Sequence, residues 1–133
     1  MKPVFLDTVG LIAVWDEDDQ WHGPAARAFA QLERQHAVMV TTPFVLAECA
    51  NAASRRPYRE EVVVLRAALE QKKRVLVPTD DDWQEAWRRY AADGIGGPGV
   101  VDHLSFIVMR RYGLSQAFTN DRHFRAAGFE PLF

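Results

Sequence analysis

The chain has 133 residues, with 16 basic and 18 acidic side chains and a formal net charge of −2. That length fits a single domain over residues 1–133 that can bury a core unaided, and the one cysteine excludes an internal disulfide framework. No apolar stretch approaches the ~20 residues of a membrane helix, and the N-terminal segment lacks the features of a secretory signal, so we expect a cytoplasmic protein with no membrane contact.

Short apolar runs alternate with helical patterns along the whole chain. In chain order we expect a strand at 4–6, helices at 11–15 and 21–34, a strand at 37–42, helices at 44–55 and 60–71, a strand at 74–78, helices at 82–92 and 100–111, a strand at 116–119, a helix at 123–128 and a marginal strand at 129–133. Thr41 or Thr42 is expected to cap the third helix, and Thr79 or Asp80 the fifth. This alternation predicts an α/β fold with a mainly parallel sheet flanked by helices.

Four carboxylates occupy positions that such a fold brings together. Asp7 and Asp121 stand where predicted strands end, and Glu48 and Asp102 stand near the starts of helices that cross back over the sheet. Parallel sheets bind ligands beyond the carboxyl ends of their strands, near the switch in strand order. We therefore expect the four acids to converge on one edge of the sheet.

The surroundings of these acids are apolar, as the segments VFLD, FVLAECAN, VVDHLSFIV and AFTND show. Aspartate and glutamate are rarely buried unless they are paired or bind metal, and four close carboxylates repel one another. Mg²⁺ and Mn²⁺ favour oxygen ligands, and one or two such ions can activate a water and hold a phosphate. The alternative from the residues alone is that each acid caps a helix or pairs with an arginine.

Several motifs together resemble the PIN-domain family, and within it the VapC-type toxins of toxin–antitoxin pairs. They are D-T-x-x-L from Asp7, a glutamate on an alanine-rich helix, VVDHLSFIVMRR around Asp102, and the closing FTNDRHFRAAGFEPLF. The resemblance covers essentially the whole chain, and the closing segment is its most specific part. It implies a three-layer fold with sheet order 3-2-1-4-5, and a metal-dependent endoribonuclease that hydrolyses RNA with Mg²⁺ or Mn²⁺ held by Asp7, Glu48, Asp102 and Asp121.

Other residues near the four acids are expected to support them. The resemblance makes Thr119 and Asn120 supporting neighbours of the site. Asn51 follows Glu48 by three residues and shares its helix face, and Ser105 follows Asp102 by about one turn. His103 and His123 adjoin site acids in the sequence, but we interpret both as non-ligands because oxygen suits Mg²⁺ better.

The resemblance also implies partners. A toxin of this type is held inactive by a small antitoxin, and we expect a two-fold homodimer as well. Four apolar side chains of the first two helices are candidates for a groove that accepts an antitoxin helix, namely Leu11, Trp15, Trp21 and Phe29. The rest of the chain carries about +2 if metal neutralises the four acids, which is compatible with RNA as substrate.

Other functions remain as alternatives. A housekeeping RNA-processing nuclease of the same family would share this chemistry, and a non-catalytic binding module would be expected to lack one or more of the acids. A phosphatase of the D-x-D type needs an acid where Val9 stands, and a phospho-acceptor receiver needs an aspartate at the end of the third strand, where Pro78 stands. The acidic run 80–82 is better explained by helix capping than by metal binding.

Overall fold

Four short segments form the strands of one parallel sheet in the computed structural model, which describes residues 2–133. The strands are β1 (Val4–Leu6), β2 (Met39–Val40), β3 (Gln116–Phe118) and β4 (Glu130–Pro131). They are ordered β2-β1-β3-β4, with Phe5 opposite Val40 on one side and Ala117 on the other. All three residues of β1 are buried, as expected for the central strand of a parallel sheet covered on both faces.

The predicted strand at 74–78 is wrong as a full strand, because only Val75 pairs, in an isolated parallel bridge with Thr41. Two backbone hydrogen bonds make that bridge, from Thr41 to Arg74 and from Leu76 to Thr41. Pro78 lacks an N–H group, and the side chain of Val77 is 71% exposed, so nothing extends the ladder. The predicted order 3-2-1-4-5 is nevertheless retained: Val75, in the segment expected as the third strand, lies at the sheet edge beside β2.

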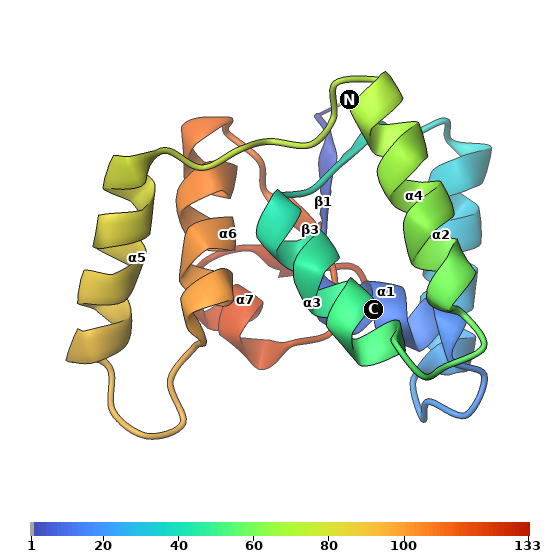
Figure 1. Cartoon of the computed structure of the whole chain (residues 1–133), viewed down its shortest axis with the longest axis horizontal. Helices are drawn as coiled ribbons and strands as arrows, with labels where there is room; N and C mark the ends of the chain where they lie inside the picture. Colours follow the sequence, from blue (N-terminus) through green and yellow to red (C-terminus); the bar gives the residue numbers. More distant parts are fainter. Residues whose placement is uncertain (1) are drawn as a thin grey trace.

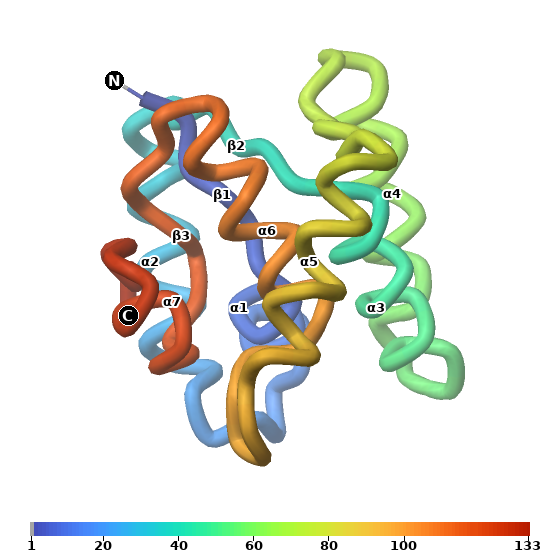
Figure 2. The backbone as a smooth tube through the Cα atoms, turned by 90° about the vertical axis from the view of Figure 1, so that its left-hand side faces the viewer, coloured from blue at the N-terminus to red at the C-terminus, as the bar shows by residue number. Residues whose placement is uncertain are grey.

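Seven helices connect the strands within residues 2–133 (Figure 1). They are α1 (Thr8–Trp15), α2 (His22–Arg34), α3 (Pro43–Ala53), α4 (Arg59–Gln71), α5 (Asp80–Ala92), α6 (Val100–Arg111) and α7 (Arg122–Ala126). Figure 2 shows α3, α4 and α5 on one side of the strands and α2 on the other, which gives the predicted helix–sheet–helix layers. None of the helices in this part of the chain has both the length and the apolar character needed to cross a membrane.

Polar side chains at the helix starts set where the helices begin. The hydroxyl of Thr42 accepts a hydrogen bond from the N–H of Val45, so Thr42 rather than Thr41 caps α3. Thr79 and Asp82 form a reciprocal capping box at the start of α5, as the capping interpretation of the acidic run predicted. Asp82 also accepts a hydrogen bond of 2.7 Å from Arg111, which joins α5 to the end of α6.

The first helix lies unusually close to β3. A Cβ atom on Gly10 would lie 2.1 Å from the carbonyl oxygen of Phe118, so only glycine allows this approach. Phe118 is fully buried, and the ring of Phe29 from α2 packs against it edge-on at a centroid distance of 5.3 Å. The contact fixes α1, and with it Asp7 at its start, against the strand that leads to Asp121.

The prediction of an exposed apolar groove on the first two helices is wrong, because most of its residues pack against other parts of the protein. Leu11 is 1% exposed and belongs to the core, and Phe29 covers β3. Trp15 stacks on Tyr58 from the segment that leads into α4, at a centroid distance of 6.3 Å. Of the four residues only Trp21 is a well-exposed side chain, at 46%. The apolar spacing of these helices therefore reflects core packing.

Candidate metal centre

The carboxyl ends of β1 and β3 bring two of the predicted acids to one edge of the sheet. Asp7 directly follows β1 and is the N-cap residue of α1, and Asp121 follows β3 and is the N-cap residue of α7. The two strands are parallel neighbours, with Leu6 paired to Phe118. Because parallel strands end at the same edge, the topology places both acids at the switch in strand order, as predicted.

Asp7 is a buried carboxylate with one good side-chain partner. Its side chain is 2% exposed, and Thr119 Oγ1 donates a hydrogen bond of 2.8 Å to Oδ2. Burial is the main cause that raises the pKa of Asp7 to about 7; the Thr119 hydrogen bond opposes this rise, and the negative charges of Asp102 and Asp121 add to it. Asp7 therefore experiences both other aspartates of the predicted site.

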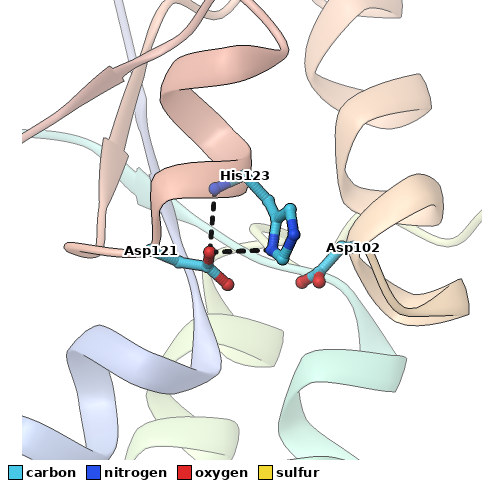
Figure 3. Close-up of side chains that lie close together, drawn as sticks. All are labelled: Asp102, Asp121 and His123. Carbon is cyan, nitrogen blue, oxygen red and sulfur yellow. Dashed lines mark hydrogen bonds and ion pairs between the residues drawn. The ribbon is translucent and has the colours of Figure 1, made fainter. Parts of the chain in front are cut away.

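Asp102, Asp121 and His123 form the tightest part of the cluster (Figure 3). Each offers one ligand atom, and these atoms all lie within 4.8 Å of one another. Asp102 lies in the first turn of α6, where its Oδ2 accepts a hydrogen bond of 3.1 Å from the N–H of Gly99. Burial raises the pKa of Asp102, and the charges of Asp121 and Glu48 raise it further. The Gly99 hydrogen bond opposes that rise.

Glu48 approaches the cluster from α3 and is the most exposed of the four acids. Its Oε1 accepts a hydrogen bond of 2.7 Å from Thr8 Oγ1, which leaves Oε2 free of that contact. Its charge contributes to the raised pKa of Asp102, so it lies within electrostatic reach of the other acids. Sequence reasoning missed Thr8 as a positioning residue, although it stands beside Asp7 in the D-T-x-x-L motif.

The expected supporting residues differ in what they contact. Thr119 joins two acids, because its hydroxyl donates to Asp7 and accepts a hydrogen bond of 3.1 Å from the N–H of Asp121. The hydroxyl of Ser105 instead donates to the carbonyl of Val101 in its own helix, which accounts for it without the site. Asn51 is exposed on α3, and Asn120 is half-buried between Thr119 and Asp121.

The two histidines beside site acids behave differently. His103 Nε2 lies 2.6 Å from Asp93 Oδ2, so this ring is directed to the loop before α6 and fits its interpretation as a non-ligand. His123 Nδ1 lies 3.1 Å from Asp121 Oδ1, inside the acidic cluster. The prediction that His123 is not a ligand is not tested by this geometry, but the ring does lie within the acidic cluster.

The donor set suits a hard divalent cation. Within residues 2–133, the one ion pair to any of the four acids comes from His123, so the arginine-pairing alternative does not describe this site. Helix capping does apply to Asp102 and Asp121, whose side chains accept backbone hydrogen bonds at helix starts. Capping uses one oxygen of each carboxylate and leaves Asp7 buried among like charges. Oxygen-rich clusters of this kind are the ligands that Mg²⁺ and Mn²⁺ prefer.

Together the fold and the site define a class of protein: a parallel α/β domain with convergent carboxylates beyond the carboxyl ends of its central strands. A family model described as the PIN domain matches residues 4–130. The chain therefore belongs to the PIN-domain family, and the predicted fold class is confirmed.

Two curated relatives and one solved structure are similar over nearly the whole chain. The 23S rRNA-specific endonuclease VapC20 of Mycobacterium tuberculosis, from strains CDC 1551 and H37Rv, is 32% identical over 127 residues, covering 95% of both chains. The crystal structure of VapC20 from Mycobacterium tuberculosis, titled a sarcin-ricin loop cleaving toxin, superposes with a TM-score of 0.75 and covers 95% of both chains. The likeness thus includes every element that carries the four acids.

Proposed function

We propose that this protein is a metal-dependent endoribonuclease that acts as the toxin of a toxin–antitoxin pair. The observation that carries the proposal is the convergence of buried Asp7 with Asp102 and Asp121 beyond the strand ends, in a cluster that no lysine or arginine of residues 2–133 neutralises. Membership of the PIN-domain family and 32% identity to an endonuclease that cleaves 23S rRNA support the same reaction class.

In this proposal the four acids hold Mg²⁺ or Mn²⁺. When bound, the ion supplies Lewis acidity for the phosphate and lowers the pKa of a coordinated water. The chain orients the ligands: Thr119 fixes Asp7 Oδ2, Gly99 fixes Asp102 Oδ2, and Thr8 fixes Glu48 Oε1. Glu48 is the most exposed of the four acids, and in this proposal its second oxygen, Oε2, would accept a proton from the attacking water.

RNA is the substrate class that the surroundings of the cluster favour. Arg122 and Arg125 lie exposed on α7, immediately after Asp121, where guanidinium groups can contact phosphates on either side of the scissile bond. The cleavage of 23S rRNA by the relative makes a ribosomal RNA hairpin loop the first substrate to test.

The partners of the proposed toxin are a small antitoxin and a second copy of the chain. An antitoxin that offers a basic side chain to the acids would satisfy them in the absence of metal, since a guanidinium binds carboxylates bidentately. Leu11 is buried in the core and Phe29 is half-buried against β3, so the antitoxin helix is not assigned to the predicted groove. Two-fold dimerisation is proposed from the family resemblance and from its frequency among soluble oligomers.

The decisive test is cleavage of a labelled RNA hairpin by the purified protein. We expect cleavage with Mg²⁺ or Mn²⁺, none with excess chelator, and recovery when Mn²⁺ is restored. Asp7→Asn and Asp121→Asn should each lower the rate by about 100-fold or more, because each removes a charged oxygen from the site. Asp81→Asn makes the same chemical change at an exposed residue of α5 and should leave the rate unchanged. Undiminished cleavage in chelator would refute the metal mechanism.

A further inference from the structure

His123 lies between the acidic cluster and residues 93–99, the glycine-rich loop that precedes α6. Its Nδ1 is 3.1 Å from Asp121 Oδ1, and its Nε2 is 2.9 Å from the carbonyl oxygen of Gly96. Figure 3 shows the ring between the carboxylates of Asp121 and Asp102. The side chain is half-buried, and each of its two ring nitrogens has a specific contact.

The two contacts fix what each ring nitrogen can do. A carbonyl oxygen only accepts hydrogen bonds, so Nε2 carries the hydrogen and donates it to Gly96. In the uncharged ring Nδ1 then carries a lone pair, which faces a carboxylate oxygen that also only accepts. Two acceptors at this distance need a positive charge, which comes either from a cation beside both or from a second proton on the ring.

We propose that His123 is a nitrogen ligand of the metal centre through Nδ1, alongside Asp102 and Asp121, with its ring held by the carbonyl of Gly96. The inference deepens the proposed function and rests on it. Metal-binding histidines characteristically donate their second ring N–H to a carbonyl or carboxylate, which fixes the tautomer and the ring orientation. The Gly96 contact is such an arrangement, and the ligand atoms of the three residues lie within 4.8 Å of one another.

The arrangement makes the glycine-rich loop part of the metal site. Gly96 holds the histidine from one point of the loop, and Asp93 at its start is bound to His103 of α6 at 2.6 Å. His103 directly follows Asp102, so the loop contacts one proposed ligand, His123, and the sequence neighbour of another, Asp102. A histidine ligand therefore connects the position of this loop to metal binding.

The test is pulsed EPR of the protein loaded with Mn²⁺ alone, without RNA. We expect electron spin echo modulation from a coordinated ¹⁴N nucleus, which changes when the histidines are labelled with ¹⁵N. The chain has four histidines, so variants assign the signal. Absence of nitrogen modulation in the wild-type protein would overturn the inference in favour of a doubly protonated ring paired with Asp121.

Two substitutions separate ligation from loop positioning. Glutamine places its amide near the position of Nε2, so His123→Gln keeps a donor for Gly96 and removes the nitrogen at Nδ1. It should abolish the modulation and weaken Mn²⁺ binding, measured by calorimetry, by about 10-fold or more. His123→Asn places an oxygen near the Nδ1 position and should lose the modulation with a smaller loss of affinity. Unchanged affinity and modulation in His123→Gln would overturn the inference.

His36→Asn is the matched control. His36 is exposed at the amino ends of the strands, opposite the cluster, and asparagine tolerates its φ of 52°. This variant should keep both the modulation and the affinity. Failure of the proposed function is separately visible: nitrogen-coordinated Mn²⁺ without RNA cleavage refutes the ribonuclease and leaves the ligand assignment intact. Mn²⁺-dependent cleavage without nitrogen coordination refutes the ligand assignment of His123 and leaves the ribonuclease intact.

Discussion

Burial and charge repulsion both act on the carboxyl group of Asp7 and both raise its pKa. Its pKa is raised from 3.8 to about 7 by burial and by the charges of Asp102 and Asp121. Between these two pH values the folded state keeps a proton that the unfolded state has released. Stability therefore falls as the pH rises from about 4 to about 7, and the full penalty is present above that range. A metal ion bound as proposed would offset this penalty by favouring the charged form.

We expect Asp7→Asn to stabilise the metal-free protein at pH 8. Asparagine has the same shape and carries no charge, so it removes a penalty of up to roughly 4 kcal/mol. Urea unfolding in chelator at pH 5 and pH 8 measures the effect, which should be much smaller at pH 5. Equal effects at the two pH values would contradict the assigned titration.

Asp82→Asn provides a contrast of opposite sign. The hydrogen bonds from Arg111 hold the pKa of Asp82 below its ordinary value, against the effect of burial. A carboxylate with a lowered pKa stabilises the folded state above its unfolded pKa, and the stabilisation is lost as the pH falls. This variant should therefore destabilise the protein at pH 8, by about 1–3 kcal/mol for a buried charged hydrogen bond.

Metal should stabilise the wild-type protein and not the Asp7→Asn variant. An ion that binds only the folded state adds about 2.7 kcal/mol when its concentration is 100 times the Kd. Scanning calorimetry with Mn²⁺ and with chelator should show a higher Tm with metal for the wild type and a small difference for the variant. An equal Tm increase in both would show that the ion binds outside the proposed site.

The sequence predicted where the acids lie better than it predicted their hydrogen-bond partners. Asp7 and Asp121 could be placed because each ends an apolar run, and parallel strands end at one edge. The Thr8–Glu48 hydrogen bond and the contact of His123 with Gly96 join segments 40 and 27 residues apart. Neither contact produces a periodic pattern. Ser105 had suitable spacing, but its hydroxyl could equally bond its own helix, as the structure shows.

At the scale of elements, the site depends on how closely α1 approaches β3. Gly10 allows the helix backbone to lie against Phe118, and Asp7 stands one turn earlier on the same helix. The segment 74–78, predicted as the third strand, shows where sequence pattern fails. Its apolar run suits a strand, but only one residue pairs with the sheet. An apolar pattern thus predicts that a segment packs against the core, whereas backbone hydrogen bonds to a neighbouring strand decide whether it becomes a strand.

We predict that Gly10→Ala strongly destabilises the protein. The added methyl group would lie 2.1 Å from a backbone oxygen, so the helix or the strand must move. Overpacking of this kind costs about 1–3 kcal/mol or more, and it would displace Asp7 from the cluster. Urea unfolding measures the first effect, and weaker Mn²⁺ binding the second.

Gly23→Ala is the control for that substitution. Gly23 lies in the first turn of α2, where an added Cβ meets only the end of the flexible Arg27 side chain, at 3.4 Å. Alanine favours helices over glycine by about 1 kcal/mol, so this variant should be as stable as the wild type or slightly more stable. A similar loss of stability in both variants would refute the close approach as the cause.

At the scale of the whole molecule, the acidic cluster and the exposed arginines together determine how the protein attracts or repels an RNA backbone. The chain carries a net charge of −2, and its cluster concentrates negative charge beside the exposed arginines of α7. Without metal the cluster repels a phosphate backbone, and with metal it attracts one. RNA binding should therefore depend on metal in the wild-type protein, and in the proposed function the same acids would offer an antitoxin a target when metal is absent.

Expression in a bacterial cell tests the proposed toxin role. Expression of the chain alone should stop bacterial growth, because cleavage of an essential RNA needs only catalytic amounts of enzyme. Asp121→Asn, which removes a ligand oxygen, should permit growth at the same soluble level, and Asp81→Asn should remain toxic. Co-expression with the product of the adjacent gene should restore growth and yield a complex by affinity purification. Growth under wild-type expression at a confirmed soluble level, with no small partner recovered, would refute the toxin role and leave the ribonuclease to the cleavage assay.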